Sequence, residues 1–334
     1  MNVSLKDSLG VLPRSNAKDM WHMGMYPPVL MDVWIYFHLI ANTILLPILV
    51  TTFFMSKKVR RHSTLVNLCI TWIFSGIFSL LLFFAGKHRG DEPGSTLCII
   101  QTSLLYGITP MWAVAILMLL YYMLVALHDD ISSLGRGITI FMLSAPYIAQ
   151  CSFTIATLIL AWNNTELVNR HRRFFYCSLN NNGLAMGMWL FTLTIGLGIL
   201  VLGVALGSTL YRNWRALRKV GQKSGVEVQL FVRVLIFVAY IAFGMFAITI
   251  SIFDPHNLMP DLYAATIGAA VFLLFGTQPD VLRVWCFWRR STPVMPCCFC
   301  SWKKKQMMGQ FDEEKGYDRN IVQRPATVLI IEHR

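Results

Sequence analysis

Seven apolar runs, each long enough to cross a lipid bilayer, constrain this chain more than any other feature. A spanning helix needs about 20 mostly apolar residues, because the hydrocarbon core of a bilayer is about 30 Å thick. Charged residues make up only 14% of the chain, against about a quarter in a soluble domain, and a soluble helical bundle would show charged faces along its helices. The runs cover residues 33–55, 65–86, 98–126, 138–162, 184–211, 229–253 and 262–285.

The runs predict an all-α fold, a seven-transmembrane helix bundle within residues 33–290. Prolines inside several runs are compatible with this fold, because neighbouring helices can satisfy the backbone groups that a proline frees. Residues 1–32 are expected to form an N-terminal segment without a secretory signal peptide, so that the first span itself directs insertion. Residues 291–334 are polar and typical of a disordered tail.

Lysine and arginine are distributed unequally between the connections, and this predicts the orientation of the bundle. One alternate set of connections holds ten basic residues and the other set holds five. The richer set comprises residues 56–64, 127–137 and 212–228. Basic residues concentrate on the cytoplasmic side of membrane proteins, so the N-terminus is predicted outside and the C-terminus inside. The net charge of +12 comes largely from such clusters, and no nucleic-acid partner is expected.

Two cysteines lie on the predicted outer side, Cys98 at the start of the third run and Cys177 in the connection 163–183. Exposed cysteines in an oxidising compartment tend to pair, so a disulfide is expected to tie this connection to the third span. Two unpaired thiols are the alternative. Glycosylation sequons at Asn2 and Asn163 fall on the same side, which agrees with the orientation.

A cysteine-rich stretch, PCCFCSWKKK, follows the last run. Cysteines next to aromatic residues and a lysine cluster suit reversible palmitoylation at the inner leaflet, reinforced by attraction to anionic lipid. The candidate residues are Cys297, Cys298 and Cys300. A zinc site is the rival interpretation, although no second group of cysteines or histidines lies nearby.

Seven spans, an outside N-terminus and a disulfide between the third span and a loop together resemble a G-protein-coupled receptor, and the divergent heptahelical receptors of fungi, basidiomycetes in particular. The third run ends in YYMLVALHDD and the seventh in FGTQPDVLRVWCFWRR, where rhodopsin-like members carry an acidic-Arg-Tyr triplet and Asn-Pro-x-x-Tyr. The resemblance implies an outer ligand pocket and an inner face for a heterotrimeric G protein.

Charged residues at the predicted inner ends are the candidates for that face. Arg212, Arg215, Arg218 and Lys219 would share one side of a helix that continues past the membrane, where they could contact an acidic partner or lipid headgroups. The full set of candidates for the G-protein face is Asp129, Asp130, Arg215, Arg218, Lys219, Arg233, Asp280 and Arg283.

Arg233 lies four residues inside the sixth run, where a charge normally needs a partner. One hypothesis pairs it with an acid of the third or seventh span, such as Asp280, so that opening the pair frees the G-protein cleft. In the alternatives, Asp280 pairs with Arg283 at a spacing of three residues, or Arg233 extends its charge to the membrane surface.

Polar and aromatic residues in the predicted outer halves of the spans are the candidates for ligand binding, because polar groups in lipid tend to face the bundle. Each could equally pack helices together. The few charges predict a small lipophilic ligand or a short hydrophobic peptide. The candidates are His38, Gln101, Tyr106, Gln150, Trp189, Thr249, Tyr263 and Thr266.

Other functional classes fit the sequence less well than a receptor in the plasma membrane. A retinal protein needs a lysine within a span, and none of the runs contains one. An enzyme needs clustered catalytic groups, which are not visible, and no cofactor is expected. A transporter or channel is the main alternative, although internal repeats, which transporters commonly show, are not visible.

Overall fold

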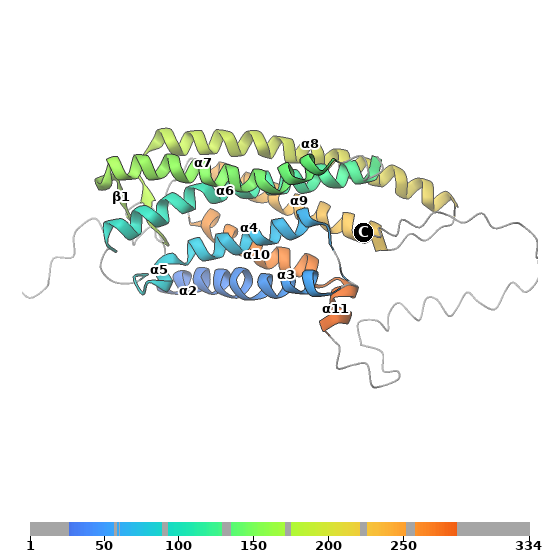
Figure 1. The fold of residues 1–334 in the computed structure, drawn as a ribbon, viewed down its shortest axis with the longest axis horizontal. Coiled ribbons are helices and arrows are strands. Elements are labelled where there is room, and N and C mark those ends of the chain that lie inside the picture. The colour runs from blue at the N-terminus through green and yellow to red at the C-terminus, as the bar shows by residue number, and fades with distance from the viewer. Residues whose placement is uncertain are drawn as a thin grey trace, which may run out of the picture. The chain divides into compact units, whose positions relative to one another are not determined.

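The described part of the chain is almost entirely helical (Figure 1). The structure is a computed structural model that describes residues 27–56, 59, 61–88, 93–128, 135–170, 175–220, 226–251 and 258–285, all within the unit Met1–Trp285. The helices are α2 Pro27–Phe37, η1 His38–Leu45, α3 Leu46–Met55, α4 Ser63–Ser79, α5 Leu81–Phe84, α6 Ser95–His128, α7 Arg136–Asn163, η3 Thr165–Leu167, α8 Asn182–Val220, α9 Val226–Ser251, α10 Met259–Gly276 and α11 Pro279–Trp285. A short antiparallel hairpin, β1 Val168–Asn169 and β2 Ser178–Leu179, joins α7 to α8.

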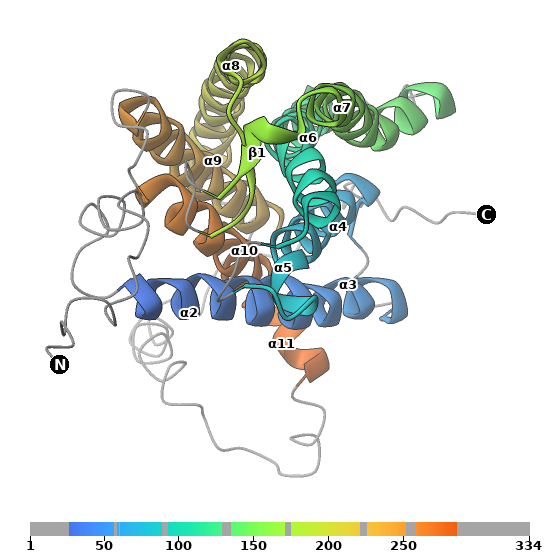
Figure 2. The same ribbon diagram turned by 90° about the vertical axis from the view of Figure 1, so that its left-hand side faces the viewer.

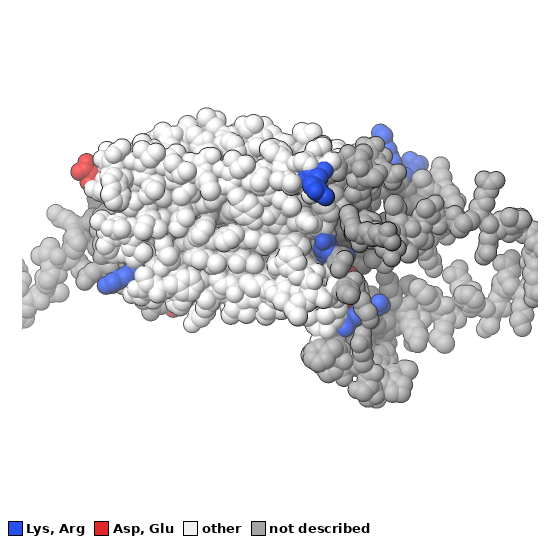
Figure 3. Space-filling view, in the orientation of Figure 1, with Lys and Arg blue, Asp and Glu red and all other residues white. Residues whose placement is uncertain are grey.

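Five helical segments among the described residues are long and apolar enough to cross a membrane, which indicates a multi-pass membrane protein. Their outward faces carry large apolar side chains; in α8, for example, Val201 and Val204 are 68% and 73% exposed. Figure 3 shows a broad band without charged side chains, with lysine, arginine and acidic residues confined to its two ends. The five segments are Val29–Met55, Ser95–Leu127, Arg136–Asn163, Asn182–Arg212 and Met259–Gly276.

The second and sixth predicted runs form shorter apolar helices, Ser63–Ser79 and Val232–Phe246 within the described residues. The second run bends at Leu80, after which α5 adds one turn before Gly86 adopts a positive φ of 66°. The seventh run is not one continuous helix as predicted. It breaks after Gly276, and Pro279 starts α11, because proline fits the first turn of a helix, where its missing N–H is not needed.

The helix α6 packs against α4, α7 and α8, whereas α10 packs against α9 and against the segment formed by α2, η1 and α3. Figure 2 shows this first segment running obliquely to the others. The hairpin lies at one end of the helices and α11 at the other (Figure 1); these are called the hairpin end and the α11 end below.

The first segment stays helical past Pro47 and contains an eight-residue π-helical stretch, His38–Leu45. His38 and Asn42 lie four residues apart on one side of this stretch, and an Asn42 amide nitrogen lies 2.9 Å from His38 Nδ1. Both side chains are buried, at 2% and 0% exposure. Local π turns are rare and commonly occur where a side chain must be redirected for a specific contact.

Asn42 fits between two other helices because each presents a glycine to it. A Cβ atom on Gly76 of α4 would overlap the Asn42 Cβ atom, and a Cβ on Gly268 of α10 would overlap the Asn42 amide oxygen. Small residues of this kind let helix backbones approach closely in membranes, where there is no hydrophobic force between helices. The packing of the first segment against α4 and α10 therefore depends on these two glycines.

Replacing Gly268 by alanine is expected to destabilise the protein by about 1–3 kcal/mol, because the added methyl overpacks the contact with Asn42. The measurement is the free energy of unfolding in detergent or lipid. Gly187→Ala is the matched control, because a Cβ there meets no atom within 4 Å, and it should be neutral or stabilising by up to ~1 kcal/mol. Equal effects of the two substitutions would contradict the packing role of Gly268.

Candidate functional site

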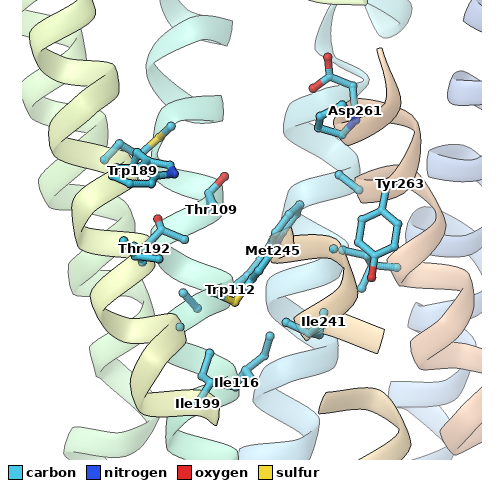
Figure 4. Close-up of a pocket in the computed structure, with 18 of the residues that line it drawn as sticks. Thr109, Trp112, Ile116, Trp189, Thr192, Ile199, Ile241, Met245, Asp261 and Tyr263 are labelled. Atoms are coloured by element: carbon cyan, nitrogen blue, oxygen red, sulfur yellow. The ribbon is translucent and has the colours of Figure 1, made fainter. Parts of the chain in front are cut away.

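A cavity of about 250 Å³ lies among α4, α6, α8, α9 and α10, and a residue of the connection between α7 and α8 also lines it. The wall is mostly apolar (Figure 4), with Trp72, Trp112, Tyr176, Trp189 and Tyr263 as its largest side chains. Pockets with a mainly apolar lining and a few polar groups are the usual form of small-molecule sites. This cavity is therefore the candidate binding site.

Glycines and stacked rings shape the wall. The rings of Trp72 and Trp112 stack with their centroids 3.9 Å apart, which joins α4 to α6. Gly244 of α9 lets the Tyr263 ring lie directly on the backbone, since a Cβ there would overlap the ring. The Tyr263 hydroxyl donates a hydrogen bond to the Tyr240 carbonyl oxygen. The wall on the α9 and α10 side is thus held in one arrangement.

Three polar atoms in cavity-lining residues have no hydrogen-bond partner: the indole nitrogens Nε1 of Trp72 and Trp112, and the hydroxyl Oγ1 of Thr192. All three are shielded from solvent in this arrangement. They are three of ten such atoms among the described residues, so the wall holds a large share of the unpaired groups. A buried donor or acceptor without a hydrogen-bond partner costs about 1–3 kcal/mol. This favours an occupant that supplies a hydrogen-bond acceptor to these groups.

The connection between α7 and α8, residues 164–181, is tied to the helices at the hairpin end and is called the cover loop. A disulfide joins Cys177 to Cys98 near the start of α6, with Cα atoms 5.3 Å apart. The predicted pairing is confirmed, and two free thiols do not describe these residues. Both cysteines are buried, so the bond anchors the loop directly on α6.

Hydrogen bonds and a ring stack also fix residues 175–179 of the cover loop. The Tyr106 hydroxyl donates to the Leu179 carbonyl at 2.9 Å, and the backbone N–H of Cys177 donates to Gln101 Oε1 at 3.2 Å. Phe175 stacks on Trp34 of α2 with centroids 5.2 Å apart. These contacts hold the loop over α2 and α6.

The cover loop also reaches the cavity. Tyr176 lines it, and its hydroxyl donates to the Asp261 carboxylate of α10 at 2.8 Å. Asp261, in the first turn of α10, is the only charged residue among the described residues that line the cavity. The bond joins the loop to the helix on the far side of the cavity from α6, so Tyr176 closes part of its rim.

Replacing Tyr176 by phenylalanine is expected to loosen the cover loop, because it removes a hydrogen bond to a charged acceptor, typically worth ~1.5–3 kcal/mol when intact. Amide hydrogen exchange in residues 175–181 should rise about tenfold, corresponding to ~1.4 kcal/mol of lost protection. Tyr36→Phe is the control, because Tyr36 lies 60% exposed on α2. Unchanged exchange in the Tyr176 variant would show that the disulfide and the other contacts hold the loop alone.

Of the eight predicted ligand residues, Trp189 and Tyr263 line the cavity. The side chain of Thr249 lies outside the described residues. The other five have partners within the protein: His38 bonds Asn42, Gln101 and Tyr106 hold the cover loop, Gln150 bonds the Leu104 carbonyl and Thr154, and Thr266 bonds Tyr240. These five are absent from the described lining of the cavity, and their role in ligand binding stays a prediction.

The sequence interpretation missed most of the wall. Trp72, Trp112, Thr192 and Met245 lie within uniformly apolar runs, where no charged face indicates which side of the helix points inward. Asp261 carried a usable signal, as an acid just before the start of the seventh run.

At the α11 end, Arg61 binds the junction between α10 and α11. Its guanidinium donates to Gln278 Oε1 and to the Asp280 carboxylate. The side chains of Arg61 and Asp280 are 16% and 32% exposed, so the pair is partly shielded from solvent. Trp285 of α11 also donates to Thr52 Oγ1 at 2.9 Å, which ties the junction to α3.

Arg233 of α9 binds the same junction in a different way. Its guanidinium donates to the carbonyl oxygens of Leu274 and Thr277 and, at 3.0 Å, to Thr277 Oγ1. These carbonyls lie in and just after the last turn of α10, where a cation is favoured by the helix dipole. In this structure the ion pair of Asp280 is with Arg61 rather than with Arg233 or Arg283, and the hypothesis that Arg233 pairs with an acid in an inactive state stays a prediction.

His62 caps α4 beside this junction and stacks on Tyr122 of α6 with centroids 3.4 Å apart. Its Nδ1 accepts from the Thr64 backbone N–H at 3.3 Å. Burial lowers the pKa of His62 from 6.5 to about 4. The ring therefore stays neutral near pH 7 and keeps the lone pair that the cap requires.

The remaining predicted residues of the G-protein face lie apart from the junction or outside the described residues. Arg215 and Arg283 are exposed, and α8 does continue to Val220 as a helix past the apolar run. The side chains of Arg218 and Lys219 and the residues Asp129 and Asp130 are outside the description, as are Asn2, Cys297, Cys298 and Cys300. Asn163 is exposed at the end of α7, and its glycosylation stays a prediction.

A double-mutant cycle should measure the Arg61–Asp280 pair directly. Replacing each residue by alanine, singly and together, is expected to give a coupling energy of about 1 kcal/mol, since exposed pairs contribute 0.2–1 kcal/mol and this one is partly shielded. The measurement is the unfolding free energy in lipid. A second cycle with Arg283→Ala and Asp280→Ala is the control and should show no coupling. Coupling to Arg283 instead would contradict the observed pairing.

No protein-family model matches the chain, and no characterised protein is significantly similar to it in sequence. Within the described residues, no group of three histidine, cysteine or acidic side chains is placed to hold a metal ion. The function must therefore be argued from the cavity and the two ends of the helices.

Proposed function

We propose that this chain is a receptor that senses a small lipophilic ligand in the cavity and signals to a heterotrimeric G protein at the α11 end. In this proposal α4 and α9 cross the membrane with the five longer segments, which gives seven spans. The hairpin end, the N-terminus and the sequons face outside. The α11 end and the cysteines after it face the cytoplasm, where palmitoylation would hold the tail at the membrane.

The observation that carries the proposal is a continuous hydrophobic core between the cavity and the α11 junction. The same cluster of buried residues includes Ile241 and Ile267, which line the cavity, and Phe275 and Val281, which flank the junction. Densely packed interiors shift between discrete arrangements rather than deform smoothly. A ligand that moves the wall thus has a packed route to the junction.

The two arginines at the junction support a switching role for it. Arg61 comes from the connection between α3 and α4, and Arg233 from α9, so both elements meet at one point. Release of either arginine would let α9 and the junction move relative to each other. The basic residues gathered near this end in Figure 3 agree with a cytoplasmic orientation.

Asp280→Asn should raise basal signalling, because it removes the charge that Arg61 binds while keeping nearly the same shape. With the purified protein in lipid nanodiscs and a panel of heterotrimeric G proteins, exchange of GDP for labelled GTPγS is expected to rise about two- to tenfold, as a shift of ~0.4–1.4 kcal/mol in a two-state equilibrium requires. Glu166→Gln is the matched control, because Glu166 is an exposed carboxylate at the hairpin end.

Two results would overturn the proposal. One is the absence of exchange on every G protein, with either the wild type or Asp280→Asn, together with solute uptake into vesicles that contain only this protein, which would favour a transporter. The other is an epitope tag after residue 334 that antibodies reach on intact cells.

A further inference from the structure

The cavity also indicates the chemistry of its occupant. Its volume of about 250 Å³ is slightly below the ~300–1,000 Å³ of pockets for drug-sized ligands. The cover loop crosses its rim through Tyr176. A small molecule fits this space, whereas a hydrophobic peptide, the other ligand class compatible with the sequence, would need a wider opening.

The charges around the cavity favour an uncharged occupant. No lysine, arginine or histidine lines it among the residues that the structure describes, so none of these offers an anion a counter-charge. Asp261, the charged residue among the described lining residues, sits at the rim and already accepts from the Tyr176 hydroxyl. Burying an unpaired charge in such a wall is costly.

The unpaired groups of the wall then define what polar feature the occupant carries. An indole N–H can only donate, and a threonine hydroxyl can donate or accept. Trp112 and Thr192 come from different helices, α6 and α8, and both side chains border the cavity in Figure 4. Thr192 can turn its hydroxyl toward the cavity by rotating its side chain. The Trp112 indole nitrogen is likewise inaccessible in this arrangement, so a shift of its ring must accompany that rotation before an oxygen with two lone pairs accepts from both residues.

A neighbouring threonine shows that the unpaired hydroxyl is not a general property of α8. Thr194 lies on the exposed side of the same helix, and its hydroxyl donates to the Leu190 carbonyl at 2.9 Å. This is the usual way in which a threonine in a membrane helix satisfies its hydroxyl. Thr192 lacks such a bond, so its donor remains available to an occupant.

We infer that the cavity binds a small, uncharged, apolar molecule that carries one hydrogen-bond acceptor, such as a ketone, ester or ether oxygen. The acceptor lies between Trp112 and Thr192, and the apolar body lies against Trp189, Met245 and Tyr263. This inference takes the cavity as the ligand site, as the proposed function does, but binding does not require a G protein.

The test uses photolabelling of the purified full-length protein in nanodiscs. Benzophenone, an uncharged diaryl ketone, is the probe, and labelled residues are located by mass spectrometry. The competitors are dicyclohexyl ketone and dicyclohexylmethane, which differ in little but the carbonyl oxygen. The label is expected on cavity residues such as Met245. The ketone should compete at about tenfold lower concentration than the hydrocarbon, as ~1.4 kcal/mol of hydrogen bonding gives.

Two substitutions that remove a hydrogen-bond donor, one of them nearly isosteric, identify the donors. Thr192→Val and Trp112→Phe should each weaken the dicyclohexyl ketone about three- to tenfold and leave dicyclohexylmethane unchanged. Thr194→Val is the matched control and should change neither. Thermal unfolding without ligand shows whether each variant is folded; Thr192→Val, the nearly isosteric change, decides the result if Trp112→Phe is unstable.

Several outcomes would overturn the inference: no saturable labelling in the cavity, equal competition by ketone and hydrocarbon, equal losses for both competitors in the variants, or stronger competition by dicyclohexylammonium, which would make Asp261 a partner for a cation. The outcomes for binding and signalling are separable. Selective ketone binding without nucleotide exchange on any G protein would uphold this inference and reject the proposed receptor function.

Discussion

Lipid offers no hydrogen-bond partners, and this constraint determines most of what is seen in the chain. Each backbone N–H and C=O group within the hydrocarbon must form its hydrogen bond inside its own helix. Most polar side chains must likewise find a hydrogen-bond partner within the protein. Hydroxyl groups along the spans do this by donating one turn back, as Thr51 does to Pro47, Ser152 to Ile148 and Thr157 to Phe153. Against this background, a polar group that lacks a partner stands out, and three such groups border one cavity.

The same constraint explains which predictions from the sequence succeeded. Span positions follow from the length and uniformity of apolar runs, so five membrane-length segments and the positions of α4 and α9 lie close to the predicted ranges. The disulfide follows from the compartment, because only Cys98 and Cys177 share the predicted outer side. Both inferences use the bilayer as the reference and need no knowledge of how the helices pack.

Side-chain roles were harder to predict, because an all-apolar run does not reveal its rotation about its own axis. Gln101 and Gln150 were candidates both for ligand binding and for helix packing, and each bonds a backbone carbonyl of another segment. Trp72 and Met245 gave no signal, since an apolar residue looks the same facing lipid or cavity. Arg233 does have partners, as the sequence predicted. They are the last carbonyl oxygens of α10 and the Thr277 hydroxyl. Glycine carries similar hidden information, since Gly76 and Gly268 matter only through what lies opposite them.

The π-helical stretch at His38–Leu45 has a consequence for how this chain is compared with others. A π turn takes in more residues than an α turn, so residues after Leu45 are rotated relative to where a regular helix would place them. Consider a relative whose first helix is a regular α-helix. Two positions that lie before and after this stretch would then be separated by fewer residues in the relative than in this chain. An alignment forced through without a gap there would match lipid-facing positions of one protein to buried positions of the other.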